Sequence, residues 1–410
     1  MPDFLTVVYL VYSFIALYFL FLFVVIYAKN RKDFFYYPPL TKIYSLSVVI
    51  PCFNEQDDIG GTIESVLASD YKGLKKIIVV DDCSTDDSFE IIKGYAKEYA
   101  KVIAVQTPKN TGCAAGSKNY GSTFVDTELI AFVDADSYPE KDSITKIVGF
   151  FDNDNTAVVT GPVLAKNRRT FIEVLQAVEY RVIAFTRKLL GYIDSIYVTP
   201  GPLAVYRKKC FDAVGRFDEK NLTEDIEITW HLLNRGWGVE MSVPAHVYTV
   251  VPDNFKGWYK QRLRWSMGGT QTINKYKKSF FKKGMLGSFV LPFFTLSWVI
   301  SFLGMGILVY RLTKRAIINY LVTAQSIGAQ AALLRFNDIN LTPNVLVFFG
   351  VAIFAIGFLF TILSLAYVKE RDFKKVKLHY FLIYSSVYLL MYPIILVISM
   401  FKLLRRERSW

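Results

Sequence analysis

The chain has 410 residues, a length that suits one or two domains. Apolar residues make up 52% of it and charged residues 20%, which excludes a disordered or low-complexity protein. The net charge of +12 does not indicate a nucleic-acid partner, because acidic residues predominate in residues 46–250 and the basic excess lies beside long apolar segments. We therefore expect a membrane protein that binds no nucleic acid.

The first predicted element is a membrane-spanning helix within residues 1–28. Residues 4–28 carry no charge, and at about 1.5 Å per residue they can cross a hydrocarbon core of about 30 Å. A cleavable signal peptide is the alternative, but the run starts with Asp3 and lacks a small-residue cleavage site. Lys29, Arg31 and Lys32 follow at once, so the positive-inside rule predicts a multi-pass protein of the cell (plasma) membrane with its N-terminus outside.

After a juxtamembrane linker at 29–45, residues 46–255 form the predicted cytoplasmic body. Apolar and amphipathic runs alternate in its first part, which predicts strands at 47–51, 77–80, 102–107 and 129–133 and helices at 59–69 and 88–101. Such alternation is typical of a parallel sheet covered by helices. The four cysteines show neither metal-ligand spacing nor a disulfide pattern, so a reducing compartment fits this body.

Acidic residues follow three of the predicted strands. Glu55 lies just beyond the first, Asp81 and Asp82 follow the second, and Asp134 and Asp136 follow the last. Ligands of open α/β sheets bind beyond the carboxyl ends of the strands, so we expect these side chains to form one acidic rim. Asp134 and Asp136 are spaced to face one hydrated divalent ion, which would bridge to substrate phosphates.

The second part of the body is less regular. Residues 168–190 place apolar side chains at helical spacing with basic residues between them, which fits either a helix at the membrane surface or an ordinary core-facing helix. Residues 199–203 contain two prolines and a glycine and predict a rigid loop. Thr223, Glu224 and Asp225 open the next helical run, and taken alone they indicate an N-cap followed by first-turn acids.

A cluster of polar and aromatic residues closes the body, within predicted interfacial helices at 256–283. Arg262 and Arg264 could hold a diphosphate in bidentate fashion, and Trp265 could stack on a sugar ring. The alternative is an interfacial helix whose arginines meet lipid phosphates and whose tryptophan anchors it. Spacing alone favours neither interpretation.

The C-terminal region, residues 284–410, contains further apolar runs. Membrane spans are predicted at 284–310, 339–368 and 378–401. A fourth uncharged stretch, 316–334, contains polar residues, and we expect it to be interfacial or re-entrant rather than a span. Whether or not 316–334 spans, one of the basic segments beside these runs is placed outside, against the positive-inside rule. The side of the membrane on which the C-terminus lies therefore stays open.

In this order the clusters resemble the family 2 glycosyltransferases, in the branch of membrane-embedded processive polysaccharide synthases. That branch includes poly-N-acetylglucosamine, hyaluronan, chitin-oligosaccharide and cellulose synthases. The matching strings are VIPCFNE from Val49, VDDCSTD from Val80, VDAD from Val133, LTEDI from Leu222 and KQRLRWSMGG from Lys260. A lone D-x-D pair is a weak signal, whereas the ordered set is a specific one.

The resemblance implies a fold and an activity. The fold is a GT-A type nucleotide-sugar-binding domain of the α/β class, with a mixed, mostly parallel sheet, inserted between transmembrane helices. The activity is that of a processive inverting hexosyltransferase that polymerises a UDP-sugar, with UDP-N-acetylglucosamine the best guess, into a β-linked polysaccharide passed through its own channel. The implied partners are the UDP-sugar, the growing polysaccharide, the bilayer and a small accessory membrane subunit or a further copy of the chain.

The resemblance also implies roles for individual residues. Asp136 would ligate Mg²⁺ or Mn²⁺, and Asp225 would be the catalytic base, with Glu224 beside it. The nucleotide-sugar would be bound by Pro51, Glu55, Asp81, Asp82, Asp134, Gln261, Arg262 and Arg264. The acceptor would be bound by Gly201, Pro202, Leu203 and Trp265.

Two positions depart from the family pattern, and two other functions stay open. Cys83 stands where the family usually has glycine, and Cys113 where relatives often have lysine, for which Lys118 could substitute in nucleotide-sugar binding.

One alternative function is that of a non-processive transferase that moves a single sugar onto a membrane lipid. The other is a transporter or scaffold with an inactive nucleotide fold, which would be expected to lack Asp136 or Asp225; both are present.

Overall fold

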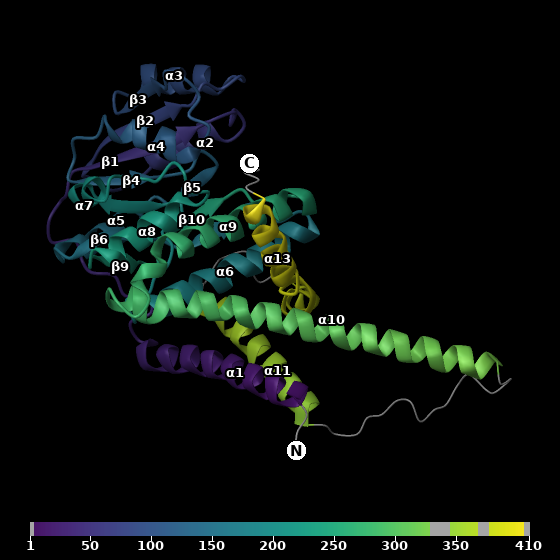
Figure 1. Cartoon of the computed structure of the whole chain (residues 1–410). Helices are drawn as coiled ribbons and strands as arrows, with labels where there is room; N and C mark the ends of the chain where they lie inside the picture. The colour runs from purple at the N-terminus through teal and green to yellow at the C-terminus, as the bar shows by residue number, and fades with distance from the viewer. Residues whose placement is uncertain (1–3, 329–344, 368–376, 406–410) are drawn as a thin grey trace.

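The computed structural model describes residues 4–328, 345–367 and 377–405. A seven-stranded sheet in the order β3-β2-β1-β4-β8-β6-β9 forms the centre of the body (Figure 1). Neighbouring strands are parallel except at β8, which is antiparallel to β4 and β6. The strands are β1 Leu46–Cys52, β2 Leu74–Asp81, β3 Val102–Gln106, β4 Leu129–Phe132, β6 Thr156–Thr160, β8 Ala204–Arg207 and β9 Gly238–Met241. The expected α/β fold with a mixed, mostly parallel sheet is thereby confirmed.

Helices cover both faces of this sheet because its central strands are apolar on both sides. All seven residues of β1 are buried, as is typical of a central parallel strand. The shorter helices of the body are α2 Ile59–Leu67, α3 Ser88–Glu98, α4 Ala114–Ser122, α5 Thr145–Val148, α7 Lys208–Ala213 and α8 Glu224–Asn234, with 3₁₀ turns at Gly149–Asp152 and Lys277–Ser279. The strands and helices predicted for residues 47–133 therefore all form, with ends shifted by a few residues.

A second, three-stranded sheet lies beside the carboxyl edge of the main sheet. It has the order β5-β10-β7, with bounds β5 Ser137–Pro139, β7 Val163–Ala165 and β10 Val247–Thr249. The antiparallel register of β10 and β5 pairs Thr249 with Ser137. This pairing brings a distant hydroxyl group next to Asp136, one residue before β5.

Two long helices connect the body with the membrane region. In α6, Phe171–Gly191, Thr170 caps the first turn in a reciprocal capping box with Glu173. One side of α6 packs on β7 and β9, and another packs on α1 and α11. The interpretation as a core-facing helix is therefore confirmed, and a position of this helix at the membrane surface stays a prediction. The second long helix is α9, Phe255–Tyr276, which Asn254 caps.

Long apolar helices lie below the body in Figure 1. They are α1 Phe4–Asn30, α10 Leu291–Gly328, which follows a π-helical turn at Leu286–Val290, and α11 Val345–Tyr367. By length and composition, residues 6–30, 286–328 and 378–404 of the described chain can each cross a membrane. Residues 316–328 continue α10 without a break instead of starting a separate segment, and the remainder of the predicted segment 316–334 lies outside the described residues.

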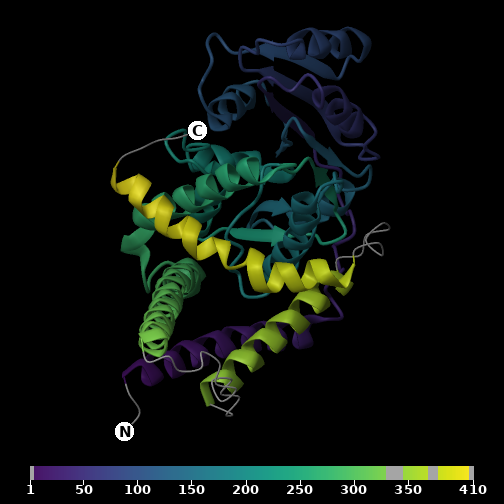
Figure 2. The same cartoon turned by 90° about the vertical axis from the view of Figure 1, so that its right-hand side faces the viewer.

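The C-terminal apolar run does not stand apart from the body. It forms α12 Leu378–Ile383, a π-helical turn at Tyr384–Tyr388 and α13 Met391–Leu404. Helix α13 packs along α9, with Ser266 Oγ and Ser399 Oγ 2.8 Å apart, and Figure 2 shows the run crossing the molecule between the body and the other apolar helices.

Candidate active site

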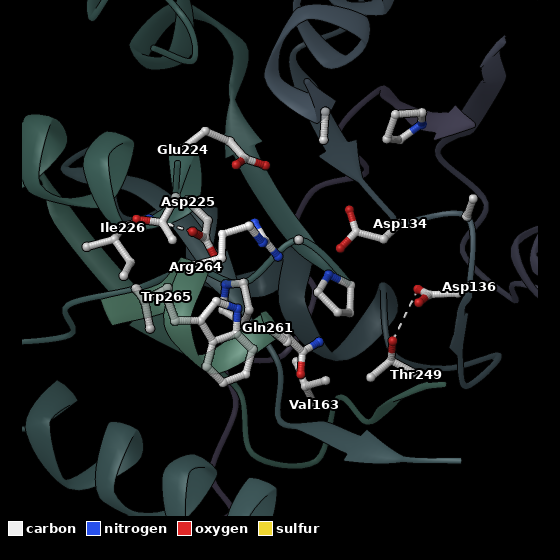
Figure 3. A pocket seen from close by; sticks show the side chains of 18 of the residues that line it. Asp134, Asp136, Val163, Glu224, Asp225, Ile226, Thr249, Gln261, Arg264 and Trp265 are labelled. Atoms are coloured by element: carbon white, nitrogen blue, oxygen red, sulfur yellow. Dashed lines mark hydrogen bonds between the residues drawn. The ribbon is translucent and has the colours of Figure 1, made fainter. Parts of the chain in front are cut away.

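A cavity of about 980 Å³ opens at the carboxyl edge of the main sheet. Figure 3 shows Asp134 and Asp136 on one side of it and Glu224, Asp225 and Trp265 on the other. Of the predicted site residues, those that line it are Pro51, Glu55, Asp82, Lys118, Asp134, Asp136, Gly201, Pro202, Glu224, Asp225, Gln261, Arg264 and Trp265. Residues separated by more than 200 positions in the chain are therefore gathered around one cavity, as the acidic-rim hypothesis predicts.

A buried ion-pair triad joins the two acidic sides of the cavity. Lys118 Nζ lies 3.0 Å from Asp134 Oδ1 and 2.9 Å from Glu224 Oε1. Burial disfavours the ammonium charge, but the two carboxylates outweigh burial and raise the pKa of Lys118. The lysine in turn outweighs burial at Glu224 and lowers the pKa of that carboxyl group. Lys118 and Glu224 are therefore both charged at neutral pH.

Asp225 differs from its neighbour Glu224 in its electrostatic environment. Burial, followed by the adjacent charge of Glu224, raises the pKa of Asp225 to about 6. Its Oδ1 accepts a hydrogen bond from the backbone N–H of Ile226, 2.9 Å away. A half-buried carboxylate of this pKa at the wall of a cavity is suited to accept a proton near neutral pH.

Asp136 has the properties expected of a ligand for a divalent cation. Its Oδ1 accepts hydrogen bonds from Ser137 Oγ at 3.0 Å and Thr249 Oγ1 at 3.2 Å, the latter drawn in Figure 3. Burial and then the charge of Asp134 raise its pKa to about 6, so a bound cation would stabilise the charged form of this carboxylate. The described residues contain no group of three or more His, Cys, Asp or Glu side chains that could hold an ion by themselves. A divalent ion bound by Asp136 would therefore have to take most of its ligands from substrate and water.

Two glycines allow the walls of the cavity to approach one another. A Cβ atom on Gly201 would lie 2.3 Å from Asp134 Oδ2, so only glycine lets the 199–203 loop reach the acidic rim. A Cβ atom on Gly268 would lie 2.2 Å from Thr223 Oγ1, so glycine also lets α9 pack against the start of α8. The second contact places Arg264 and Trp265 of α9 beside Asp225.

Three predicted residues do not line the cavity. Leu203 has no exposed surface and belongs to the core. Asp81 is also fully buried, and its Oδ2 accepts a hydrogen bond from Gln106 Nε2 at 2.8 Å. Arg262 is 1% exposed and pairs with the buried carboxylate of Glu179, because its position on α9 faces α6 and α13 and not the open side. The structure thus gives Arg262 a packing role where the sequence predicts contact with the diphosphate.

Asp82 lies at the cavity, but its carboxylate is already engaged by the protein. Its Oδ1 accepts from Thr107 Oγ1 at 2.7 Å, and its Oδ2 accepts from Thr111 Oγ1 at 2.7 Å. The neighbouring Cys83 has a φ of +61°, in the left-handed region that favours glycine. The turn after the Asp pair therefore keeps the conformation that glycine usually provides, although a cysteine occupies the position.

Sequence reasoning missed several residues that line the cavity. Tyr180, Ile183 and Arg187 share one face of α6, and Tyr384 and Tyr392 come from the C-terminal helix. The spacing of the three α6 residues is visible in the sequence, but it does not reveal which face turns toward the active site. The tyrosines come from a segment predicted to lie inside the membrane.

The chain is similar in sequence to known glycosyltransferases. Residues 47–215 match the family model described as glycosyl transferase family 2. A poly-β-1,6-N-acetyl-D-glucosamine synthase of Staphylococcus aureus (strain MSSA476) is 28% identical over 299 residues, which cover 71% of this chain and 69% of that protein. The synthase of the same name from Staphylococcus epidermidis is 26% identical over 264 residues, 63% of each chain.

Among solved structures, a mannosyltransferase from Pyrobaculum calidifontis, in complex with GDP-mannose and Mn²⁺, resembles this chain in fold. The TM-score is 0.63 at 15% sequence identity, and the match covers 97% of this chain and 99% of that one. The fold is of the GT-A type, and the family match together with the similar synthases indicates a glycosyltransferase that uses a nucleotide-diphosphate sugar. Residues 47–215 are therefore assigned to a glycosyl transferase family 2 domain.

Proposed function

We propose that this enzyme is a membrane polysaccharide synthase that adds N-acetylglucosamine from UDP-N-acetylglucosamine in β linkage. The named relatives, which are poly-β-1,6-N-acetyl-D-glucosamine synthases, support this donor and product class. The observation that carries the proposal is the shared cavity of Asp136 and Asp225, whose walls come from the nucleotide-binding edge of the sheet and from helices next to the membrane segments.

In the proposed reaction, an acceptor hydroxyl oxygen attacks the anomeric carbon of the donor. The bond from that carbon to the diphosphate breaks, UDP leaves, and Asp225 takes the proton of the hydroxyl group. One displacement inverts the configuration, so an α-linked donor yields a β-linked product. Burial and the charge of Glu224 raise the pKa of Asp225 to about 6, so this carboxyl group is deprotonated and available as a base above about pH 6.

The leaving diphosphate needs positive charge, which two sources would supply. A Mg²⁺ or Mn²⁺ ion held by Asp136, when bound, would neutralise the developing charge on the diphosphate. Arg264, which donates a hydrogen bond to the carbonyl of Leu222 at 3.2 Å, presents the remainder of its guanidinium group to the cavity. Gln261 and Trp265, on the same face of α9, would bind the sugars.

Processive synthesis and export are part of the proposal. Phe294 of α10 and Tyr384 and Leu389 of the C-terminal run line the cavity, so an elongating chain could leave toward the membrane helices. A polysaccharide is too polar to cross hydrocarbon unaided, and a passage among the apolar helices would remove that barrier. The body would then lie in the cytoplasm of the cell, with the N-terminus outside.

The same membrane-facing wall supports a second candidate, the transfer of one sugar to a lipid acceptor. Phe294, Ile183 and Leu389 give that end of the cavity an apolar lining, which would accommodate the start of a lipid chain. Product size separates the two candidates, because a synthase makes a long chain and a lipid transferase makes a glycolipid with a single sugar.

The function can be tested with the full-length protein purified in detergent. It would be incubated with UDP-N-acetylglucosamine, UDP-glucose, UDP-galactose or UDP-glucuronate and with Mg²⁺ or Mn²⁺, and UDP release and product mass would be measured. We expect the fastest turnover with UDP-N-acetylglucosamine and a polymeric product. A product with one sugar would favour the lipid transferase, and turnover with none of the four donors would contradict the proposal.

A further inference from the structure

One buried cation at the cavity has two nitrogen atoms without a hydrogen-bond partner in the part of the chain that the structure describes. Arg187, on α6, is 4% exposed, and its Nε and Nη1 atoms have no hydrogen-bond partner among the described residues. Arg187 nevertheless is one of the residues that line the cavity. An unpaired buried charge is strongly unfavourable, so an arginine in this state is best explained by an anionic ligand that completes it.

Arg187 lies at the end of the cavity remote from the nucleotide edge. Tyr180, which packs against Trp265 with ring centroids 6.4 Å apart, precedes Arg187 by seven residues on the same helix. At a rise of about 1.5 Å per residue, the backbone of Arg187 is about 10 Å further along α6 than that of Tyr180, which packs against Trp265. The diphosphate of the donor, proposed to lie between Asp136 and Arg264, is therefore not the anion that meets Arg187.

The surroundings of Arg187 place it at the level of the membrane helices. Phe185, two residues earlier, has its ring 5.6 Å from that of Tyr27 in α1 and 5.4 Å from that of Phe360 in α11. On the cavity side, Tyr197 and Phe294 stand near Arg187, with ring centroids 4.7 Å apart. An anion bound here would have apolar side chains and membrane helices on its outer side.

We infer that Arg187 binds the phosphate group of a membrane lipid that serves as the first acceptor of the enzyme. A guanidinium group recognises phosphate through charge-assisted, bidentate hydrogen bonds, and the apolar surroundings suit the hydrocarbon chain of the same molecule. The sugar hydroxyl groups carried by that lipid would then face Asp225, which interacts electrostatically with Arg187 across the cavity. The inference rests on the proposed function, for which it names the primer from which a chain would start.

The test measures binding, so it does not depend on turnover. Dodecyl phosphate and dodecanol would be titrated into the full-length protein in dodecyl maltoside micelles, and tryptophan fluorescence would be recorded, since Trp265 lines the same cavity. We expect dodecyl phosphate to bind about 10- to 100-fold more tightly than dodecanol, as is typical of a hydrogen bond to a charged group. Inorganic phosphate at the same concentration should not displace it.

Variants assign the effect to Arg187. Arg187→Gln should reduce the affinity for dodecyl phosphate to that for dodecanol, and Arg187→Lys should keep part of the preference. Lys188→Met is the matched control, because Lys188 is a neighbouring buried cation on α6 that donates to the carbonyl of Met241 at 3.0 Å and does not line the cavity. This variant should keep the full preference.

Three results would overturn the inference. The first is equal affinity of the native protein for dodecyl phosphate and dodecanol, and the second is an unchanged preference for dodecyl phosphate in Arg187→Gln. The third is displacement of dodecyl phosphate by inorganic phosphate, which would indicate a site for a soluble anion. A native protein that releases UDP but shows no phosphate preference contradicts the primer site alone. One that binds dodecyl phosphate but releases no UDP from any donor contradicts the proposed function instead.

Discussion

Asp225 is the residue whose protonation should govern the rate. Because burial and Glu224 raise its pKa to about 6, the basic form is lost as the pH falls through that value. We expect kcat/KM to be level near pH 8 and to fall about tenfold per pH unit well below pH 6. The measurement is the initial rate of UDP release between pH 4.5 and 8.5.

Asp136 also has a pKa of about 6, so a control must separate the two groups. A metal ion competes with protons for Asp136, and raising Mn²⁺ tenfold should move only that contribution to lower pH. An acidic limb that moves entirely with Mn²⁺ would assign the profile to the metal ligand and contradict the role of Asp225.

Arg262 and Glu179 form a buried pair whose expected effect is on stability. Arg262→Met leaves Glu179 charged and unpaired and should lower the free energy of unfolding by about 3–5 kcal/mol. The double variant Arg262→Met with Glu179→Met should recover most of that loss. Thermal unfolding in detergent measures both, and a rise in donor KM at unchanged stability would instead support the diphosphate contact predicted from the sequence.

Cys83 offers a prediction about backbone strain. A side chain at φ +61° costs about 1 kcal/mol relative to glycine, so Cys83→Gly should raise the unfolding temperature. The matched substitution Cys52→Ala, at a buried strand position, should lower it. A drop on Cys83→Gly would mean that the contact of its thiol with the carbonyl of Thr107 outweighs the strain.

The sequence predicts the position of some residues at the cavity but not of others, because some positions depend on packing between segments far apart in the chain. Strand-end acids such as Asp134 and Asp136 could be placed because parallel strands share a carboxyl edge. Arg262 and Arg264 could not be distinguished, since two positions on one helix face different neighbours and only the packing of α6 and α13 decides which of them is buried. The same holds for Arg187, whose neighbours come from segments far away in the chain.

At the scale of elements, the docking of α13 on α9 is the feature least visible in the sequence. The C-terminal run 378–404 has the length and composition of a membrane span. Nevertheless, Tyr388 contacts Trp258 of the polar helix α9, and Ser399 contacts Ser266 of the same helix. We therefore expect this helix to lie in the plane of the membrane surface and not to cross it.

This docking predicts a cross-link. Ser266→Cys with Ser399→Cys should form a disulfide on mild oxidation, because the two Oγ atoms are 2.8 Å apart. The control pair Ser266→Cys with Ser386→Cys should stay reduced, since Ser386 is exposed and its hydroxyl group donates within its own helix. The readout is thiol labelling in membranes, and a reduced Ser266/Ser399 pair would place α13 elsewhere.

For the whole molecule, an in-plane α13 gives a topology that the charge pattern alone leaves open. In this predicted topology α1, α10 and α11 would be the spans, the N-terminus would lie outside, and residue 377 would lie in the cytoplasm. The basic residues at both ends of the 378–404 run then lie inside, as the positive-inside rule favours. A fluorescent protein fused after Trp410 should fluoresce in cells, and a fused phosphatase that requires export should be inactive there.

Export of the product is the second prediction at this scale. Protein sealed in vesicles with its body outward, and supplied with UDP-N-acetylglucosamine outside, should deliver polymer to the lumen. Protection of the polymer from an added glycosidase measures this, with detergent-opened vesicles as the control. Polymer that is fully degraded in sealed vesicles would contradict passage through the enzyme.

The central claim is that Asp136 and Asp225 act on one bound nucleotide-sugar from opposite walls of one cavity. Its most direct test compares Asp225→Asn with the native protein in two measurements on the same sample, UDP release and Mn²⁺-dependent binding of UDP. We predict that UDP release falls at least about 100-fold while the affinity for UDP changes less than about threefold. Unchanged UDP release in Asp225→Asn would contradict the claim.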